Sequence, residues 1–596
     1  MSAKNFFWFI VLNTALWGLV SLVYFFTGGF YWDAPGFFFG LSSVPGHLLL
    51  FALGLSVLVL PFRLVGPKTG AAAAVAFGGV FTLFFAADAF VFTQYRFHIG
   101  VAMLELFFGP AGREIFVFPA ITYVMLALAV AGVFALTYGL LWAARKITLG
   151  KKAVWAVCLL WLGAFLTYHS LHAWGKFMLV PSVLAQVSYM PWANPLSANR
   201  KLRKMGFEPK SEPYSEPKKG TLNYPLHPMQ CASTPKTNIL VILIDAWRAD
   251  SFTKEVMPHT WAAYKNANAW YFTNHLSGGN ATEAGVFSLF YSMPYLYWDS
   301  FTGQTRQPIL MEELQAKGYQ MGIFASSKLN SPAFNKNIFS QVENLRIESK
   351  GTTKVERDRD MQKDFLHFLK NRDKNAPFFG FLFYDAAHGQ EFPQGGDKFK
   401  PVGEEMNYLV LTKNTDPTPY MNRYKNAVYF IDGLLGQVFE TLKAQGLSDN
   451  TLVILTGDHG QEINDTRHNF WGHNSNFAQW QTQVPLLMWW PGHTGGEKAY
   501  RTAHYDIVPF LLTHILGCTN PPGDYSTGTD LLDETPRPYT VISSYTKKAI
   551  QTGDNLSVID NYGYLEHYDK NYQKLPTGAD PKAITQAFKE FAKFYK

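Results

Sequence analysis

Five long apolar segments occupy the first 175 residues and constrain the fold of this chain more than any other feature. They are Phe6–Phe26, Pro45–Val65, Ala71–Phe92, Ile115–Trp142 and Ala153–Trp174. Each has about 20 residues or more, the length that an α-helix needs to cross a hydrocarbon core about 30 Å thick. Soluble cores rarely contain apolar runs this long with so few charges, and the first segment is too long for a signal-peptide core and lacks an Ala-x-Ala-like cleavage pattern. The sequence therefore predicts five transmembrane helices within residues 1–175.

The basic residues of the short loops predict the orientation of these helices. One side carries Lys4, Arg63, Lys68, Arg145, Lys146, Lys151 and Lys152, and the other carries Arg96 and Arg113. Because Lys and Arg concentrate in cytoplasmic loops, we expect a cytoplasmic N-terminus. Five spans then place the rest of the chain on the opposite side, which is the periplasm if the membrane is the inner membrane of a Gram-negative bacterium.

A segment rich in Pro, Ser, Asn and Lys, residues 176–236, follows the last apolar run and has the composition of a linker at the membrane surface. It contains a basic cluster made of Arg200, Lys201, Arg203 and Lys204. A cation near an anionic membrane surface contributes about 1 kcal/mol to binding. The cluster is a candidate site for anionic lipid head groups, with a solvated basic turn as the alternative.

Residues 237–596 have the pattern of a separate globular domain, with a small C-terminal subdomain. Amphipathic stretches such as Tyr424–Leu442 alternate with the short apolar runs Ile239–Ile244, Gln320–Phe324, Phe378–Phe383, Leu452–Leu455 and Pro485–Trp490. This alternation predicts an α/β fold with a mostly parallel central sheet and helices on both faces. Ligands of such folds bind at the carboxyl ends of the strands. Of the three cysteines, Cys158 lies in a predicted span, so at most Cys231 and Cys518 can pair.

Polar side chains follow the first and the fourth of these apolar runs. Asp245 comes after the first, and Asp458 and His459 come after the fourth in Thr-Gly-Asp-His-Gly. Two carboxylates and an imidazole suit Zn, Mn or Mg, although a lone Asp after a strand is often a turn or helix-cap residue. The sequence therefore predicts one divalent metal ion at this edge of the sheet.

A Gly-rich turn, residues 277–285, runs into a helix-like segment and contains Thr282. A hydroxyl there lies where backbone N–H groups and the helix dipole favour an anion. Thr282 is the candidate nucleophile, activated by the metal rather than by a base, with a helix N-cap as the alternative. His388 and His473 follow other strand ends and suit an oxyanion-binding or leaving-group role, or a second metal ion held with Asp385.

These stretches resemble the alkaline-phosphatase/sulfatase superfamily, in the branch with a threonine nucleophile that includes lipoteichoic acid synthases and phosphoethanolamine transferases. The matching stretches are Asn-Ile-Leu-Val-Ile-Leu-Ile-Asp-Ala, Gly-Asn-Ala-Thr, Thr-Gly-Asp-His-Gly-Gln-Glu and Gln-Val-Pro-Leu-Leu-Met-Trp-Trp-Pro-Gly. The resemblance implies that His388 and His473 hold a substrate phosphate and that the metal ligands are Asp245, Thr282, Asp458 and His459. The branch usually has Glu where this chain has Asp245. No cysteine lies in the Cys/Ser-x-Pro-x-Arg context of sulfatases that form formylglycine, so sulfate-ester hydrolysis is the least expected activity.

A second resemblance covers nearly the whole chain. The five spans, the linker Leu-Ser-Ala-Asn-Arg-Lys-Leu-Arg-Lys-Met-Gly and the stretch Ser-Gly-Gly-Asn-Ala-Thr-Glu-Ala-Gly are similar to a family of enterobacterial inner-membrane proteins. That resemblance implies binding of lipid A or cardiolipin through the linker, with Arg200 and Lys201 on the lipid phosphate. It also implies control of lipopolysaccharide synthesis through a protein adaptor that presents the committing deacetylase to a membrane protease, with an enzyme-like site that is partly vestigial.

Three classes of function remain open. The first is a metal-binding regulator of lipopolysaccharide and outer-membrane lipid homeostasis with residual phosphatase activity, and it is our hypothesis. The second is an active metal-dependent phosphohydrolase, or a phosphoethanolamine or phosphoglycerol transferase, that acts on envelope lipids through Thr282. The third, a transporter, is the weakest, because the spans lack paired charges and inverted repeats. We expect no nucleic-acid partner.

Overall fold

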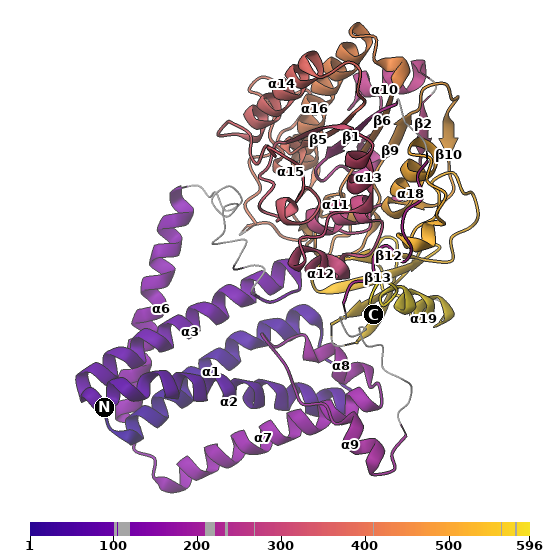
Figure 1. The fold of residues 1–596 in the computed structure, drawn as a ribbon. Helices are drawn as coiled ribbons and strands as arrows, with labels where there is room; N and C mark the ends of the chain where they lie inside the picture. Colours follow the sequence, from indigo (N-terminus) through magenta and orange to yellow (C-terminus); the bar gives the residue numbers. More distant parts are fainter. Residues whose placement is uncertain are drawn as a thin grey trace. The chain divides into compact units, whose positions relative to one another are not determined.

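The computed structural model describes residues 1–100, 104, 120–208, 221–232, 237–267, 269–408, 410–561, 563–578 and 581–596. The chain divides into two compact units (Figure 1). The first consists of Met1–Ser215 with Asp560–Leu565, and the second consists of Glu216–Ile559 with Glu566–Lys596. The main boundary between them falls inside the linker that the sequence predicts.

Five long helices build the first unit, and each is long and apolar enough to cross a membrane. They are α1 (Ala3–Gly28), α2 (Ala34–Val65), α3 (Pro67–Tyr95), α6 (Ala120–Lys146) and α7 (Lys151–Phe177). They confirm the predicted spans, although α2 begins at Ala34 and runs through Pro45, where the apolar run begins. Membrane helices tolerate internal proline because neighbouring groups satisfy the freed backbone carbonyl. Residues 115–119 of the fourth predicted span lie outside the described residues.

Asp88 is a buried carboxylate of α3, and its hydrogen bonds give it a structural role. Tyr24 Oη donates to its Oδ2 at 2.7 Å, and the backbone N–H of Ile99 donates to its Oδ1 at 2.7 Å. His98 Nδ1 lies 2.7 Å from the same Oδ2. Both oxygens of the carboxylate are thus satisfied, as a buried charged group requires.

A seven-stranded sheet forms the centre of the second unit, in the order β10-β2-β9-β6-β1-β5-β4. The bounds are β1 Asn238–Ile244, β2 Trp270–Phe272, β4 Gln320–Ala325, β5 Phe378–Tyr384, β6 Thr451–Gly457, β9 Leu486–Trp489 and β10 Gly496–Lys498. Strand β1 pairs in parallel with both β5 and β6, and β4 pairs in parallel with β5. The prediction of a mostly parallel sheet is confirmed, with β9 antiparallel to both β6 and β2.

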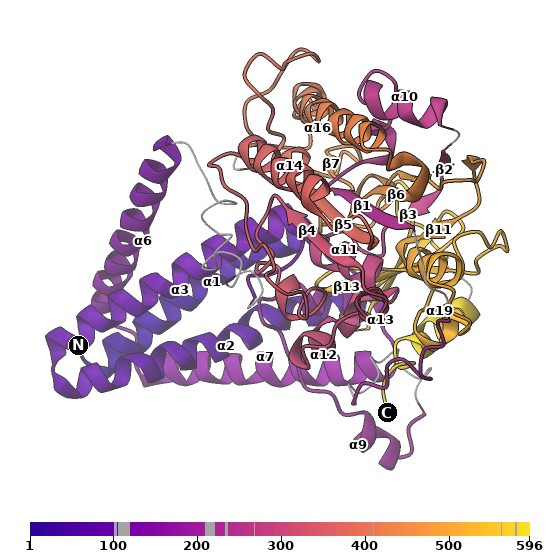
Figure 2. The ribbon, with the colours of Figure 1, turned by 45° about the horizontal axis from the view of Figure 1, so that its top comes forward.

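Helices cover both faces of this sheet (Figures 1 and 2). One face carries α11 (Thr282–Tyr291), α13 (Ile309–Ala316) and α18 (Ile507–Phe510), and the other carries α10 (Pro258–Asn266), α14 (Lys354–Asn371) and α16 (Thr418–Ala444). Successive residues of β1 point to alternate cores, with Val241 in the first and Ile242 in the second. Because both faces are buried, the central residues of β1 and β6 are apolar, and polar residues lie only near the ends of these strands.

The C-terminal strands form a second sheet in the order β12-β13-β14-β15. The bounds are β12 Thr540–Ser543, β13 Lys547–Thr552, β14 Asn555–Asp560 and β15 Leu565–Asp569, followed by α19 (Pro581–Glu590). The end of β12 pairs with the Gly-rich turn: Ser543 N donates to Gly278 O at 2.9 Å, and Asn280 N donates to Ser543 O at 3.2 Å. This sheet therefore helps to hold the turn that leads to Thr282.

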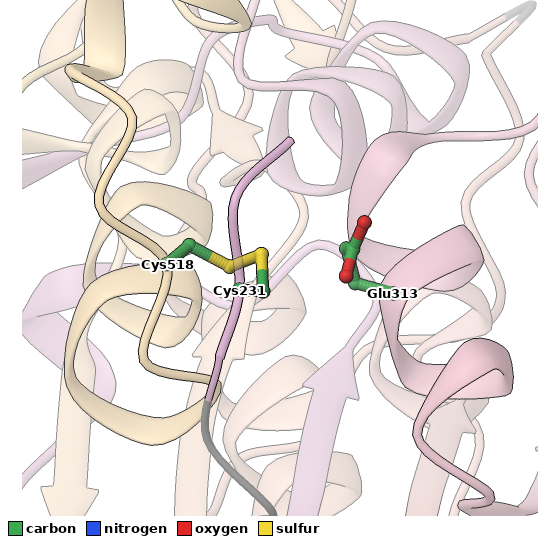
Figure 3. Close-up of side chains that lie close together, drawn as sticks. All are labelled: Cys231, Glu313 and Cys518. Carbon is green, nitrogen blue, oxygen red and sulfur yellow. A yellow bond between two sulfur atoms is a disulfide. The ribbon is translucent and has the colours of Figure 1, made fainter. Parts of the chain in front are cut away.

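A disulfide joins Cys231 to Cys518 (Figure 3). It fastens residues 221–232 to the rest of the second unit, where Leu226 N also donates to Asp524 O at 2.8 Å. The carboxylate of Glu313 in α13 lies close to the two sulfurs. Since the sulfurs are bonded to each other, they offer no thiolate, so this group is a covalent crosslink and not a metal site.

Candidate metal centre and basic helix

The four side chains expected to bind a metal ion meet at the carboxyl ends of β1 and β6. His459 Nε2 lies 3.2 Å from Thr282 Oγ1, 3.4 Å from Asp458 Oδ2 and 3.7 Å from Asp245 Oδ1. The parallel pairing of Ile244 with Gly457 explains the meeting, because it places Asp245 and Asp458 side by side. Thr282 is the first residue of α11 and Ala281 holds the N-cap position, so the hydroxyl does not cap the helix.

Three atoms of this group fit a cation: two carboxylate oxygens and His459 Nε2, which has Thr282 Oγ1 as a hydrogen-bond neighbour. Asp245 Oδ1 and Asp458 Oδ2 are buried and have no hydrogen-bond partner among the described residues. The other oxygen of Asp458 accepts from Ala246 N at 3.0 Å and from His459 N at 2.8 Å. His459 Nδ1 lies 2.8 Å from Gly460 O, so it donates there and leaves the lone pair of Nε2 facing the carboxylates. A divalent ion would satisfy all three atoms, and Asp245, Asp458 and His459 form a group able to hold one.

The electrostatics of the group also favour a bound cation. Burial raises the pKa of Asp245 well above its ordinary value, and the neighbouring carboxylates Asp458 and Asp385 raise it further. Burial lowers the pKa of His459, so this imidazole is neutral near pH 7 and can act as a ligand. A divalent ion would offset the repulsion among the carboxylates and keep them ionised.

His388 and His473 stand beside this group. The ring of His473 lies 4.3 Å from that of His459 and 5.2 Å from that of His388, measured between centroids. His473 Nδ1 lies 3.0 Å from Gln461 Oε1, an acceptor, so Nδ1 carries the hydrogen and Nε2 is available. Burial lowers the pKa of His473 well below its ordinary value. Two imidazoles thus stand beside His459. In its neutral state His473 has an acceptor at Nε2, so it can bind an oxyanion only when the ring takes up a proton.

A second group able to hold a cation contains Asp245, Asp385 and His388. His388 Nδ1 lies 3.1 Å from Asp385 Oδ1 and 3.8 Å from Asp245 Oδ2. The sequence indicates this group through Asp385, which follows β5. It does not indicate Lys354, whose Nζ lies 2.5 Å from Asp385 Oδ2. Lys354 begins α14 in an ordinary helix-start pattern, so no sequence signal connects it with the strand ends.

The predicted lipid-binding residues lie elsewhere, in the first unit. Helix α9 (Asn199–Lys204) carries Arg200, Lys201, Arg203 and Lys204, and all four side chains are exposed. Helix α9 packs against α7, and the ring of Phe207 lies 5.5 Å from that of Trp174 at the end of α7. Large apolar side chains are exposed before and after α9: Trp192, Leu196, Met205 and Phe207. Cations and apolar groups therefore adjoin the end of the fifth candidate span.

Comparison with known proteins agrees with this division of the chain. Residues 237–518 match the sulfatase family, and residues 3–231 match a domain of unknown function, DUF3413. The solved lipoteichoic acid synthase LtaP from Listeria monocytogenes is 15% identical; the match covers 61% of this chain and 91% of LtaP, with a TM-score of 0.44. The second unit is therefore sulfatase-like over residues 237–518, and the first unit, with its five candidate spans, matches a separate domain.

Two relatives extend over nearly the whole chain. The inner membrane protein YejM of Salmonella typhimurium is 23% identical over 591 residues, which cover 95% of this chain and 93% of YejM. An uncharacterized protein of Haemophilus influenzae is 26% identical over 568 residues, which cover 91% of this chain and 87% of that protein. The chain is thus similar to YejM over nearly the whole length of both proteins.

Proposed function

We propose that this protein regulates lipopolysaccharide and outer-membrane lipid homeostasis by sensing an anionic lipid, lipid A or cardiolipin, at the outer face of the inner membrane. The observation that carries the proposal is α9, whose four cations are exposed beside the end of the fifth candidate span. Four cations near an anionic surface contribute about 4 kcal/mol, at about 1 kcal/mol each. Both lipids present phosphate groups, which Arg and Lys bind with charge-assisted hydrogen bonds.

The apolar side chains around α9 support a position at the membrane surface. Trp192 and Phe207 are exposed, and aromatic side chains concentrate at membrane interfaces. A solvated basic turn would have no reason to present Trp, Leu, Met and Phe together with its cations. We therefore assign Arg200 and Lys201 to the lipid phosphate and Arg203 and Lys204 to the surrounding anionic surface.

The second unit lies in the periplasm in this proposal. The cationic loops at Lys4, Arg63 and Lys68 favour a cytoplasmic N-terminus, and five spans then carry the chain across. The disulfide between Cys231 and Cys518 supports the same placement, because such bonds persist in oxidising compartments. The relation to YejM, an inner membrane protein, supports the choice of membrane.

The metal centre is retained in the proposal and supplies a residual phosphatase activity. A divalent ion bound there would lower the pKa of a bound hydroxyl and polarise a phosphate ester. Thr282 would offer its hydroxyl to that ion, and His388 and His473, once protonated, would contact the phosphate oxygens. The metal ion is Zn, Mn or Mg. The alternative function, an active phosphohydrolase or phosphoethanolamine or phosphoglycerol transferase, is favoured by one observation: Thr282 Oγ1 lies 3.2 Å from His459 Nε2, as a nucleophile beside a metal ligand would.

A membrane-protein adaptor is the partner in this proposal. Helices α6 and α7 support this partner. In each, only 11% of the most apolar stretch is buried among the described residues. Two spans with such exposed faces offer a surface on which another membrane helix can pack. The adaptor would carry the signal of lipid occupancy to the cytoplasmic side, where lipopolysaccharide synthesis is controlled.

The proposal is tested with the double variant Arg200→Glu/Lys201→Glu of the full-length protein. In nanodiscs that contain lipid A or cardiolipin, loss of two cations alone should weaken lipid binding by about 2 kcal/mol, or about thirtyfold. In cells, the variant should disturb lipopolysaccharide levels. The matched control Lys374→Glu/Lys443→Glu changes two exposed lysines of the second unit and should bind lipid normally. If both variants bind lipid equally and the cells have normal lipopolysaccharide, the proposal is wrong and the cluster in α9 is a solvated basic turn.

A further inference from the structure

We propose that the Lys354 ammonium takes the place of a second metal ion at the group formed by Asp245, Asp385 and His388. The protein would then use one divalent ion and one built-in organic cation. This inference rests on the proposed metal ion at Asp245, Asp458 and His459, and it assigns the second group a different occupant.

The contacts of Asp385 show that its carboxylate is already engaged by a cation. Lys354 Nζ donates to Asp385 Oδ2 at 2.5 Å, and Ser327 Oγ donates to the same oxygen at 2.6 Å. The guanidinium of Arg357 lies 3.9 Å from it. Asp385 and Lys354 are 2% and 13% exposed at their side chains, so solvent screens this pair weakly. A metal ion would have to displace the ammonium to reach Asp385 Oδ2.

The start of α14 places the side chain of Lys354 beside Asp385. Thr353 and Glu356 form a capping box at the start of α14, which fixes the backbone of Lys354. Lys354 N donates to Glu391 Oε2 at 2.8 Å, and this bond ties the start of the helix to the chain after His388. Gly389 leaves room for the aliphatic stem, because a Cβ there would lie 2.6 Å from Lys354 Cε and nearer still to Cδ. The start of α14, the hydrogen bond to Glu391 and the space left by Gly389 together place the Lys354 ammonium against Asp385.

The count of charges supports one metal ion and one ammonium. When ionised, the carboxylates of Asp245, Asp385 and Asp458 carry three negative charges, and the neighbouring Arg357 and ionised Asp358 add one charge of each sign. A divalent ion and the Lys354 ammonium balance them, whereas two divalent ions together with the ammonium would leave excess positive charge in a buried site. The ammonium also keeps Asp385 ionised, so that Asp385 Oδ1 can accept the hydrogen of His388 Nδ1 and fix the orientation of this ring. Lys354 is thus a positioning residue for His388.

The test is the metal content of the full-length protein in detergent, measured by elemental analysis after saturation with Zn or Mn and desalting. Lys354→Met removes the charge and keeps the length of the side chain, and Lys354→Gln also keeps a hydrogen-bond donor for Asp385. We expect each variant that remains folded to hold one more ion per chain than the unsubstituted protein. Adding His388→Ala should abolish the gain. Lys354→Arg, which keeps the positive charge, and Lys328→Met, a change at a partly exposed lysine, should show no gain.

The quantity that decides the inference is the difference in metal content between variant and parent. No gain in Lys354→Met and Lys354→Gln, with unfolding transitions like the parent's, would overturn it, and so would two ions per chain in the parent. The parent's own content tests the proposed metal centre separately, because a parent without metal would refute that centre while the gain in the variants would still report on Lys354.

Discussion

Gly285, in the first turn of α11, packs directly against the main-chain carbonyl oxygen of Asp458. A Cβ at this position would overlap that oxygen. Ser277 Oγ donates to the same carbonyl at 2.5 Å, so two residues of the Gly-rich segment bind the turn that carries Asp458 and His459. The contact sets the distance between the hydroxyl of Thr282 and the metal ligands.

This contact predicts that Gly285→Ala is harmful although alanine favours helices. The added methyl must push α11 away from Asp458, and overpacking of a buried contact costs about 1–3 kcal/mol. We expect a lower midpoint of thermal unfolding and weaker metal binding, measured on the full-length protein in detergent. The matched control is Gly433→Ala in α16, where a Cβ meets no atom within 4 Å among the described residues. Helix propensity predicts that the control gains about 0.5–1 kcal/mol, and equal effects of the two changes would contradict the packing argument.

Metal binding should weaken as the pH falls. Burial and the neighbouring carboxylates Asp458 and Asp385 raise the pKa of Asp245, so protons compete with the metal ion for this ligand. Acidification through the raised pKa therefore lowers the affinity, by up to about tenfold per pH unit for each proton displaced. Titration calorimetry with Zn or Mn between about pH 8 and about pH 6 measures the slope. Asp458→Ala should abolish binding at every pH, and an affinity independent of pH would show that Asp245 is not a ligand.

The proposed orientation predicts which thiols can be labelled from outside. In a Cys158→Ala/Cys518→Ser variant, the half-buried Cys231 loses its disulfide partner and becomes a free thiol. A maleimide that cannot cross the inner membrane should label it in cells with a permeabilised outer membrane. A cysteine introduced at Lys4, with all three natural cysteines replaced, should react only after the inner membrane is broken. Labelling of the Lys4 position but not of Cys231 would reverse the orientation.

The main parts of the fold could be predicted from the sequence because they depend on local patterns. Five apolar runs of spanning length indicate the helices, and apolar runs such as Ile239–Ile244 indicate buried strands with both faces covered. The register of β1 against β6 then brings Asp245 and Asp458 together, as neighbouring parallel strands must. The antiparallel direction of β9 relative to β6 could not be predicted from the sequence, because a short apolar run has the same composition in either direction.

Other parts of the site depend on contacts between distant segments. Lys354 reaches Asp385 only because α14 begins beside the loop after β5, and its own sequence context is that of an ordinary capped helix. The tie between Ser543 and the Gly-rich turn joins residues more than two hundred positions apart. The pattern of charged and apolar residues along the chain does not predict such contacts between distant segments.

The central claim is that lipid sensing through α9, and not chemistry at Thr282, is the main function. Thr282→Ala removes the proposed nucleophile, and such a loss can lower kcat by about a millionfold. In a strain that depends on this protein, Thr282→Ala should lose phosphatase activity on an aryl phosphate, and Thr282→Ser should keep part of it.

The most direct measurement compares the lipopolysaccharide level of two such strains, one with Thr282→Ala and one with Arg200→Glu/Lys201→Glu. We predict normal growth and lipopolysaccharide with Thr282→Ala and a disturbed level with the charge reversal, both proteins being folded and present in equal amounts. A disturbed level with Thr282→Ala and a normal level with the charge reversal would show that catalysis is the function and would contradict the account.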